Sequence, residues 1–509
     1  MSKYVIGVDI GTTSTKSVMF DLGGNAIAQQ TIGYPLDTPS QGAAVQDSDR
    51  IFRAVVDTVK QLVTQTSINP SEILCMSFSA AMHSLIMVDR AGQPLSPSLT
   101  WADNRSAVWA DKLKQEYDGE RIYARTGTPI HPMSPFVKLM WLRHTSDLWQ
   151  QTAKFISIKE YVFWQLFQKY VVDYSIASAT GLFNFHRLDW DTEALSIVDI
   201  DANQLSQPVP TTTIFRSMQS QYASEMGIDP NTPVVIGAND GVLANLGVGA
   251  IDPGIVAVTV GTSGAIRTTI DKPQIDPQGL LFCYALTENY WVVGGAVNNG
   301  GIILRWIKEQ LASTEAETAK LLQQDPYDLI TAIAQTIPAG SSGLIFHPYL
   351  AGERSPLWDA NARGSFFGLG LHHNKAHLIR AILEGVVYNL YSVFQAVENV
   401  AGEVTSVKAA GGFARSCLWQ QMLADIFNKE VIIPASYESS CLGAAILGLY
   451  ALEKISDITE FKFHRNFDTR RFPTADNVAK YQQILPIYFR LIESFKREYK
   501  AIAKLQQEI

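Results

Sequence analysis

The sequence predicts an α/β protein made of two similarly built domains. Its 509 residues exceed the size near which single hydrophobic cores stop growing, about 250–300 residues. Short β-rich segments alternate with segments whose apolar residues recur at helical spacing, a pattern typical of α/β folds. A strand-and-turn motif near the N-terminus also returns about halfway along the chain.

Local patterns predict the individual elements. Strands are expected at residues 4–9, 17–21, 26–32, 73–78, 233–237 and 404–410. Asp47 precedes residues 51–63, whose apolar side chains have helical spacing, so it should cap a helix. Residues 474–509 form a second long helical pattern, which Pro486 should break or kink.

The repeated motif occupies residues 5–14 and 255–264, so each residue of the second copy is numbered 250 higher. Each copy is an apolar strand that runs into a Gly-Thr-Thr or Gly-Thr-Ser turn. Coincidence is the plain alternative, because strand-turn-strand units are common. Two facing turns would suit phosphates, since amides and hydroxyls donate to anionic oxygens and glycine permits close approach. We therefore expect domains at residues 1–247 and 248–509. Neither a P-loop nor a Rossmann fingerprint is present.

Composition excludes several classes of protein. The formal net charge is −8 and no dense Lys/Arg run exists, which argues against nucleic acid as a partner. The longest uncharged run, residues 329–352, is interrupted by glycines and prolines, so it should not span a membrane. The N-terminus has no signal-peptide pattern. The four cysteines lie far apart without metal or redox spacing, which favours reduced thiols in a cytoplasmic protein.

Two aspartates at strand ends are the main candidates for chemistry. Asp240 follows the strand at residues 233–237, and ligands in α/β folds sit beyond the carboxyl ends of strands. It could accept a proton from a substrate hydroxyl, or it could simply cap the following helix. Asp9 ends the first strand beside the first turn, where a carboxylate suits Mg²⁺ or merely shapes the turn. The second copy has Thr259 there, so only the first turn would face a metal.

Other polar segments are weaker candidates. His83 follows a strand, although a lone histidine is more often structural than catalytic. Trp101 with polar neighbours is weakly indicative of sugar binding, while Arg105 could instead pair with Asp103 on the surface. The glycines at residues 411–412 could let a nucleotide base approach the backbone, or they could form an ordinary turn.

Together these segments resemble the FGGY family of carbohydrate kinases over nearly the whole chain and in the family's order. The shared motifs are Asp9-Ile10-Gly11-Thr12-Thr13-Ser14-Thr15-Lys16, Met82-His83, Trp101-x-Asp103-x-Arg105, Asp240, Gly261-Thr262 and Gly411-Gly412. Two family signatures are more specific. The first resembles residues 133–142 but departs at His144 and Thr145, and the second fits residues 364–384 throughout.

The resemblance implies an actin/hexokinase-like ATPase (ribonuclease H-like) fold with the active site in the cleft between two domains. It also implies a role for each matching residue. Asp240 would be the general base, and Asp9 would hold Mg²⁺ through water. The residues that would bind sugar are Met82, His83, Trp101 and Arg105, together with Asp240. Those that would bind ATP are Thr12, Thr13, Lys16, Gly261, Thr262, Gly301, Gly412 and Ser416.

The segments at residues 79–84 and 126–135 look most like the gluconokinase members of the family. This implies ATP-dependent phosphorylation of a terminal hydroxyl, with D-gluconate as the expected substrate. Xylulose- and glycerol-type members have Gln after the catalytic Asp, where this chain has Gly241. A pentulose or polyol kinase remains the alternative, and an actin- or chaperone-like nucleotide-binding protein is the alternative outside enzymes. The candidates for reading a substrate carboxylate are His131, Arg105 and Lys138. A homodimer is compatible with the family, but no residue specifies it.

Overall fold

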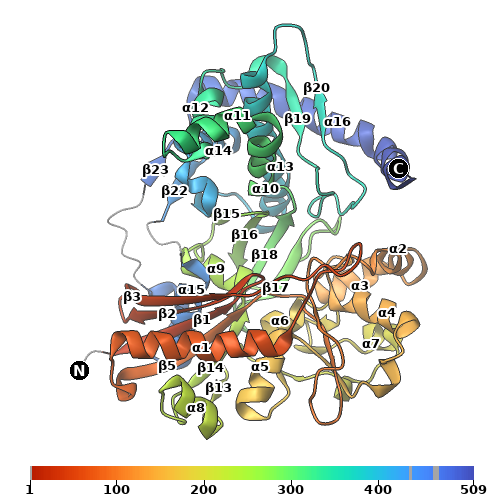
Figure 1. Cartoon of the computed structure of the whole chain (residues 1–509). Helices are drawn as coiled ribbons and strands as arrows, with labels where there is room; N and C mark the ends of the chain where they lie inside the picture. Colours follow the sequence, from red (N-terminus) through yellow and green to blue (C-terminus); the bar gives the residue numbers. More distant parts are fainter. Residues whose placement is uncertain (1–2, 435–437, 462–468, 509) are drawn as a thin grey trace.

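The chain folds into two lobes, each built around a mixed β-sheet (Figure 1). A computed structural model describes residues 3–434, 438–461 and 469–508. The first sheet has the strand order β13 (Ile214–Phe215), β14 (Val234–Asn239), β5 (Ile73–Ala80), β1 (Tyr4–Ile10), β2 (Ser14–Asp21) and β3 (Ala26–Gly33). The second has the order β17 (Phe282–Ala285), β18 (Trp291–Val297), β16 (Gly264–Ile270), β15 (Ile255–Val260), β21 (Ser406–Ala410), β22 (Glu430–Ile433) and β23 (Thr469–Arg471).

The predicted internal repeat is confirmed as a repeated piece of sheet. In the first lobe β1 pairs antiparallel with β2 and parallel with β5. In the second lobe β15 pairs antiparallel with β16 and parallel with β21 in the same way. Each Gly-Thr turn therefore connects the first two strands of its sheet, at the edge where the parallel strands end.

Helices cover these sheets and extend the lobes. α1 (Ser48–Thr66) packs on β2 and β3, and α13 (Lys375–Ala401) packs on β16 and β18. The other helices of the first half are α2 (Ala107–Glu116), α3 (Gly119–Thr126), α4 (Pro135–Thr145), α5 (Ile158–Phe167), α6 (Tyr174–Ser178), α7 (Thr192–Val198), α8 (Ser220–Met226) and α9 (Asp240–Gly247). Those of the second half are α10 (Gly301–Trp306), α11 (Ser313–Leu321), α12 (Pro326–Gln335), α14 (Cys417–Phe427), α15 (Ser439–Ala451) and α16 (Ala475–Glu508).

Helices α1 and α16 test two local predictions. Asp47 caps α1, its carboxylate accepting from the amide of Arg50 at 3.0 Å, as expected. Of the expected break or kink at Pro486, the break is wrong, because α16 continues through this residue. Proline removes one helical hydrogen bond, but Tyr481 and Tyr488 on either side are fully buried against the second lobe. Their packing outweighs the local cost.

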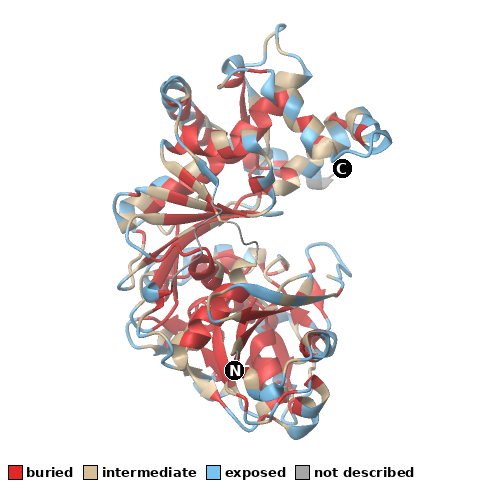
Figure 2. Cartoon of the chain, turned by 90° about the vertical axis from the view of Figure 1, so that its left-hand side faces the viewer, coloured by how far each residue is buried: buried red, intermediate tan, exposed pale blue. Residues whose placement is uncertain are grey.

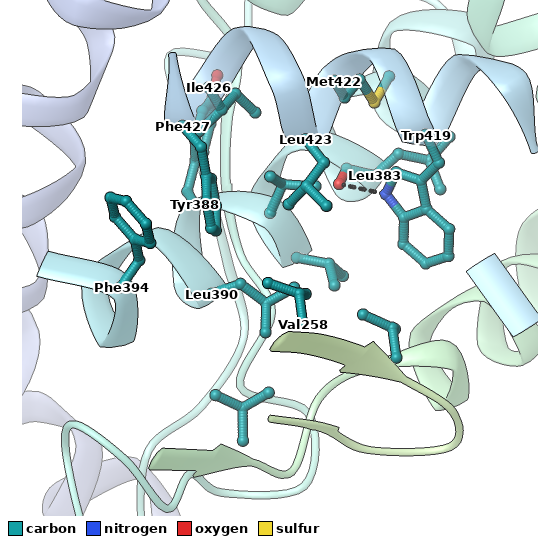
Figure 3. Packing of buried hydrophobic residues seen from close by; sticks show 14 of the residues in the cluster. Val258, Leu383, Tyr388, Leu390, Phe394, Trp419, Met422, Leu423, Ile426 and Phe427 are labelled. Atoms are coloured by element: carbon teal, nitrogen blue, oxygen red, sulfur yellow. Dashed lines mark hydrogen bonds between the residues drawn. The ribbon is translucent and has the colours of Figure 1, made fainter. Parts of the chain in front are cut away.

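The core of the second lobe lies between its sheet and two helices (Figure 3). Val258 of β15 faces Leu383 and Leu390 of α13, which in turn pack under α14. The indole of Trp419 donates to the carbonyl of Leu383 at 3.1 Å, so its polar edge is satisfied while its rings stay buried. Figure 2 shows the same distribution over the whole chain, with buried residues in the sheets and in the helix faces that cover them.

Helix α15 belongs to the second half of the sequence but packs on the first lobe, against β1, β5 and α9. Its residues are apolar on all sides, as expected for a helix enclosed by protein. Two glycines permit the contact with α9. A Cβ atom on Gly443 would lie 2.0 Å from the carbonyl oxygen of Leu243, and one on Gly247 would lie 1.8 Å from that of Ser439. This close crossing ties the second half of the chain to the helix that begins at Asp240.

No helix in the described part of the chain is both long enough and apolar enough to cross a bilayer. The uncharged residues 329–352 instead include most of α12 and the short strand β19 (Ile345–His347), which packs on α13.

Candidate active site

A cavity of about 280 Å³ is lined by residues from both halves of the chain. The first half contributes Thr12, Ala81, Met82, His83, Trp101, Met133 and Asp240. The second contributes Thr259, Gly261, Ser263, Gly264, Ala265, Arg267, Phe282, Tyr284, Ala296, Arg354 and Trp358. The structure therefore brings Met82, His83, Trp101 and Asp240 together, as the sequence predicted.

Asp240 begins α9 where β14 ends. It is not the cap of that helix, because the side chain of Asn239 fills that role by accepting from the amide of Val242 at 2.8 Å. Burial raises the pKa of Asp240 to about 6, and the charge of Asp9 adds to the rise, while Arg267 opposes it. The carboxylate is therefore available to accept a proton near neutral pH.

Asp9 lies on β1, with Lys16 opposite it on β2 and Ser79 opposite it on β5. The hydroxyl of Ser79 donates a hydrogen bond to the carboxylate of Asp9 at 2.6 Å. Burial raises the pKa of Asp9. Lys16 reaches across to the other half of the chain and pairs with Glu438 at 2.6 Å. The sequence did not predict this ion pair, because Glu438 is distant from Lys16 along the chain.

His83 is buried and adopts the left-handed conformation, with φ of 68°. Its Nδ1 lies 2.8 Å from the carbonyl oxygen of Ala179. Burial lowers the pKa of His83 to about 3, so the ring is neutral at pH 7. Since a carbonyl can only accept, Nδ1 carries the proton and Nε2 is left as an acceptor. That nitrogen can accept a hydrogen bond from a sugar hydroxyl.

Trp101 connects the cavity to the first turn. Its indole donates to the hydroxyl of Thr12 at 2.9 Å, and its ring lies 5.0 Å from the guanidinium of Arg354. Thr12 thereby lines the cavity, whereas Thr13 is exposed beside it.

The cavity is not lined by any of the three side chains considered for a substrate carboxylate, which are His131, Arg105 and Lys138. Arg105 pairs with Asp103 at 2.6 Å, as the alternative anticipated, and stacks on Trp141. The pair does not lie on the surface, because Asp103 is fully buried. The ammonium of Lys138 is buried and donates to the backbone carbonyls of Met133 and His83, and burial lowers its pKa to about 7.

His131 accepts from the amide of Met133 at 3.2 Å, and burial lowers its pKa well below the ordinary value. It is therefore neutral at pH 7 and cannot supply a charge. These environments leave a different pair of cations, Arg267 and Arg354, facing the cavity.

Neither arginine was identified from the sequence. For each arginine, the surrounding sequence contained a weak indication that its charge is unusual. Arg267 interrupts an otherwise uncharged strand just after the second turn, and Arg354 follows the uncharged run at residues 329–352. Alternation along β16 places Arg267 on the same face as Ala265, which also lines the cavity.

A second cavity of about 370 Å³ lies in the second lobe and shares Gly261 with the first. It gathers the predicted nucleotide residues Thr262, Gly301, Gly412 and Ser416. Tyr327, Phe413 and Trp419 add aromatic surface that the sequence did not indicate. The turn at Gly261 therefore separates a space suited to a flat ring system from the space that contains Asp240.

Glycines shape this second cavity. A Cβ atom on Gly301 would lie 2.6 Å from the carbonyl oxygen of Gly261, so glycine lets the start of α10 meet the turn. Gly411 has φ of 104° and packs against Val260, which leaves Gly412 with nothing near its missing side chain. The backbone at Gly412 thus has free space beside it, which the expected approach of a ligand would require.

Comparisons with known proteins cover almost the entire chain. Residues 4–247 match the N-terminal domain of the FGGY family of carbohydrate kinases, and residues 256–452 match its C-terminal domain. The chain is 53% identical to a protein named gluconokinase from Bacillus subtilis (strain 168), covering 100% of this chain and 99% of that protein. It is 27% identical to the xylulose kinase of the same organism, covering 96% of each.

Solved structures agree on the fold. A gluconate kinase from Lactobacillus acidophilus superposes with a TM-score of 0.92 at 37% identity, covering 99% of this chain and 100% of that one. A ligand-bound xylulose kinase from the same organism superposes with a TM-score of 0.92 at 38% identity, covering 98% and 100%. These two neighbours establish the architecture equally well and do not separate the two sugars.

Proposed function

Because the chain belongs to the FGGY family of carbohydrate kinases, we propose that it transfers the terminal phosphoryl group of ATP to D-gluconate, giving 6-phospho-D-gluconate. The observation that carries the reaction type is the position of Asp240 in a cavity that meets the nucleotide-sized cavity at Gly261. Support for the sugar is the full-length identity of 53% to a gluconokinase against 27% to a xylulose kinase.

In the proposed reaction Asp240 accepts the proton of the terminal hydroxyl as its oxygen attacks the phosphorus. Positioning and charge stabilisation dominate phosphoryl transfer, because the transition state is loose. Thr12 and Gly261 line the same cavity from the two halves of the chain, and their turns would offer hydroxyl and amide donors to the phosphate oxygens. His83 and Trp101 orient the sugar, and Gly301, Gly412 and Ser416 frame the adenosine.

We infer that Mg²⁺ binds beside Asp9, where it would neutralise charge on the phosphates. Among the residues that the structure describes, no three His, Cys, Asp or Glu side chains converge to hold a metal. A single carboxylate suits Mg²⁺ nevertheless, because this ion keeps several waters and takes phosphate oxygens as ligands. We place the reaction in the cytoplasm, because the four cysteines are unpaired as expected in a reducing compartment.

The test is a coupled assay of ADP release with D-gluconate, D-xylulose, D-ribulose, glycerol and xylitol at equal enzyme concentration. We expect kcat/KM for D-gluconate to exceed that for each neutral compound by at least about 100-fold, the discrimination available when a charged group must be matched. A larger kcat/KM for any neutral compound would refute the assignment of gluconate and leave the reaction type intact.

The raised pKa of Asp240 predicts the pH dependence of the reaction. The general base acts as the carboxylate, so activity should be full above its pKa and lost below it. With a pKa of about 6, kcat/KM should fall about tenfold per pH unit below pH 6 and stay level from pH 7 to 8. A profile that is flat down to pH 4.5, in an enzyme shown by circular dichroism to remain folded, would contradict this role.

A further inference from the structure

Two guanidinium groups in the sugar cavity form no direct ion pair with any described carboxylate. Arg267 and Arg354 both line the cavity that contains Asp240. In the described ranges neither of them takes part in an ion pair within 4.0 Å. The Nε atom of each is inaccessible to solvent and has no hydrogen-bond partner among the described residues. Arg354 is only 8% exposed, so its charge is held inside the protein.

The carboxylate next to Arg354 in the sequence is already engaged. Glu353 accepts from the amide of Asn298 at 2.5 Å and from that of Arg354 at 2.8 Å. Its other oxygen accepts from the side chains of Asn299 at 2.9 Å and Asn389 at 2.7 Å. These four donors hold the carboxylate of Glu353, which bonds to the backbone amide of Arg354 and not to its guanidinium. The guanidinium of Arg354 donates to the carbonyl of Val297 at 3.2 Å.

Asp240 lies near Arg267 but is needed for the reacting hydroxyl. The guanidinium of Arg267 packs against Gly241, where a Cβ atom would lie 3.0 Å from its Nε and Nη2 atoms. Arg267 therefore stands at the start of α9, and Arg354 stands beside Trp101. Burial and the neighbouring charge of Arg267 lower the pKa of Arg354 to about 10 against the opposing effect of Glu353. At pH 7 both arginines carry a charge, and together they repel each other.

Building on the proposed function, we propose that Arg267 and Arg354 bind the carboxylate of the sugar acid between them. A guanidinium presents paired N–H donors that match the two oxygens of a carboxylate. Asp240 and Glu353 favour the charged forms of these arginines without forming an ion pair with them. The anion would add a direct partner for the two guanidinium groups, and a neutral alcohol in its place would not. These two arginines therefore select a sugar acid over a pentulose or polyol of similar size.

The experiment compares D-gluconate with D-glucitol, in which a hydroxymethyl group replaces the carboxylate. Assays run at pH 8, well above the pKa of Asp240, so that loss of the nearby arginine does not alter the protonation of the base. We expect Arg267→Met to lower kcat/KM for D-gluconate by about 10- to 100-fold, the effect of losing a charge-assisted hydrogen bond. The inhibition constant of D-glucitol, as a competitor of D-gluconate, should change less than about threefold.

Two further variants complete the design. Arg267→Lys keeps the charge and should recover part of the lost kcat/KM, although an ammonium cannot reproduce the paired donors. Arg363→Met is the matched control, because this arginine lies near Arg354 in the sequence but bonds to Gln506 on α16 at 2.7 Å. Its kinetics should equal those of the wild type.

The outcomes separate the inference from the function on which it rests. Equal weakening of D-gluconate and D-glucitol in Arg267→Met, or unchanged D-gluconate kinetics, would overturn carboxylate recognition while leaving the kinase assignment in place. A wild-type enzyme that prefers a neutral sugar would instead overturn the proposed substrate itself.

Discussion

Asp240→Asn should lower kcat with D-gluconate by about 10²- to 10⁴-fold, the usual contribution of a general base. Asparagine has nearly the same shape but cannot accept the proton of the attacking hydroxyl. KM for ATP should change little, because the nucleotide cavity shares Gly261 with the sugar cavity but does not include Asp240. The measurement is steady-state kinetics at pH 8.

The fold should survive this substitution. Burial and Asp9 both disfavour the charged form of Asp240, so its removal relieves an electrostatic cost. We expect a change in melting temperature below about 2 °C, equivalent to about 1 kcal/mol for a lobe of roughly 250 residues. Asp271→Asn, at an exposed position after β16, is the control and should leave both activity and stability unchanged. Wild-type kcat in Asp240→Asn would remove this residue from the mechanism.

Gly443→Ala should destabilise the protein by about 3 kcal/mol and also impair activity, because overpacking costs about 1–3 kcal/mol and occasionally more. The new Cβ would lie 2.0 Å from a backbone oxygen of α9, which cannot rotate away. The two helices must therefore move apart. Since α9 begins with Asp240, the displacement reaches the carboxylate proposed as the general base, and a 1 Å error in such a position can cost about 100-fold in rate.

Denaturant unfolding followed by circular dichroism measures the stability, and the ADP-release assay measures kcat. Gly448→Ala is the matched control on the same helix, since its Cβ would meet the side chain of Cys75 at 3.0 Å and not a backbone atom. It should cost about 1 kcal/mol or less, because a side chain can shift and alanine favours the helix. Equal stability of Gly443→Ala and the wild type would show that α9 and α15 are not held by this contact.

Much of this arrangement could be anticipated from local sequence. The two Gly-Thr turns, the strand before Asp240 and the cap at Asp47 each depend on neighbours in the chain, and the structure has them where expected. The glycines at residues 411–412 already suggested a place for a nucleotide base, and the resemblance to the family added Gly301 and Ser416 as expected nucleotide contacts. The structure gathers Gly301, Gly412 and Ser416 in one cavity.

The features that were missed depend on contacts between distant segments. The apolar sequence of α15 indicates burial but not that its partner is the first lobe. Lys16 could be assigned to phosphate, yet its pairing with Glu438 joins opposite ends of the chain. Arg267 and Arg354 were missed for the same reason. Only the folded structure shows that both arginines line the cavity. It also shows that Arg105 pairs with Asp103 and that Lys138 donates to backbone carbonyls.

The most direct test of the central claim is to identify the product formed from D-gluconate and ATP by ³¹P and ¹H NMR. The proposed geometry places one terminal hydroxyl at Asp240 and the carboxylate at the two arginines. It therefore predicts a single phosphate ester whose phosphorus couples to the protons on the sixth carbon, formed together with one equivalent of ADP. A phosphate ester at another carbon, or ADP released with inorganic phosphate and no sugar ester, would contradict it.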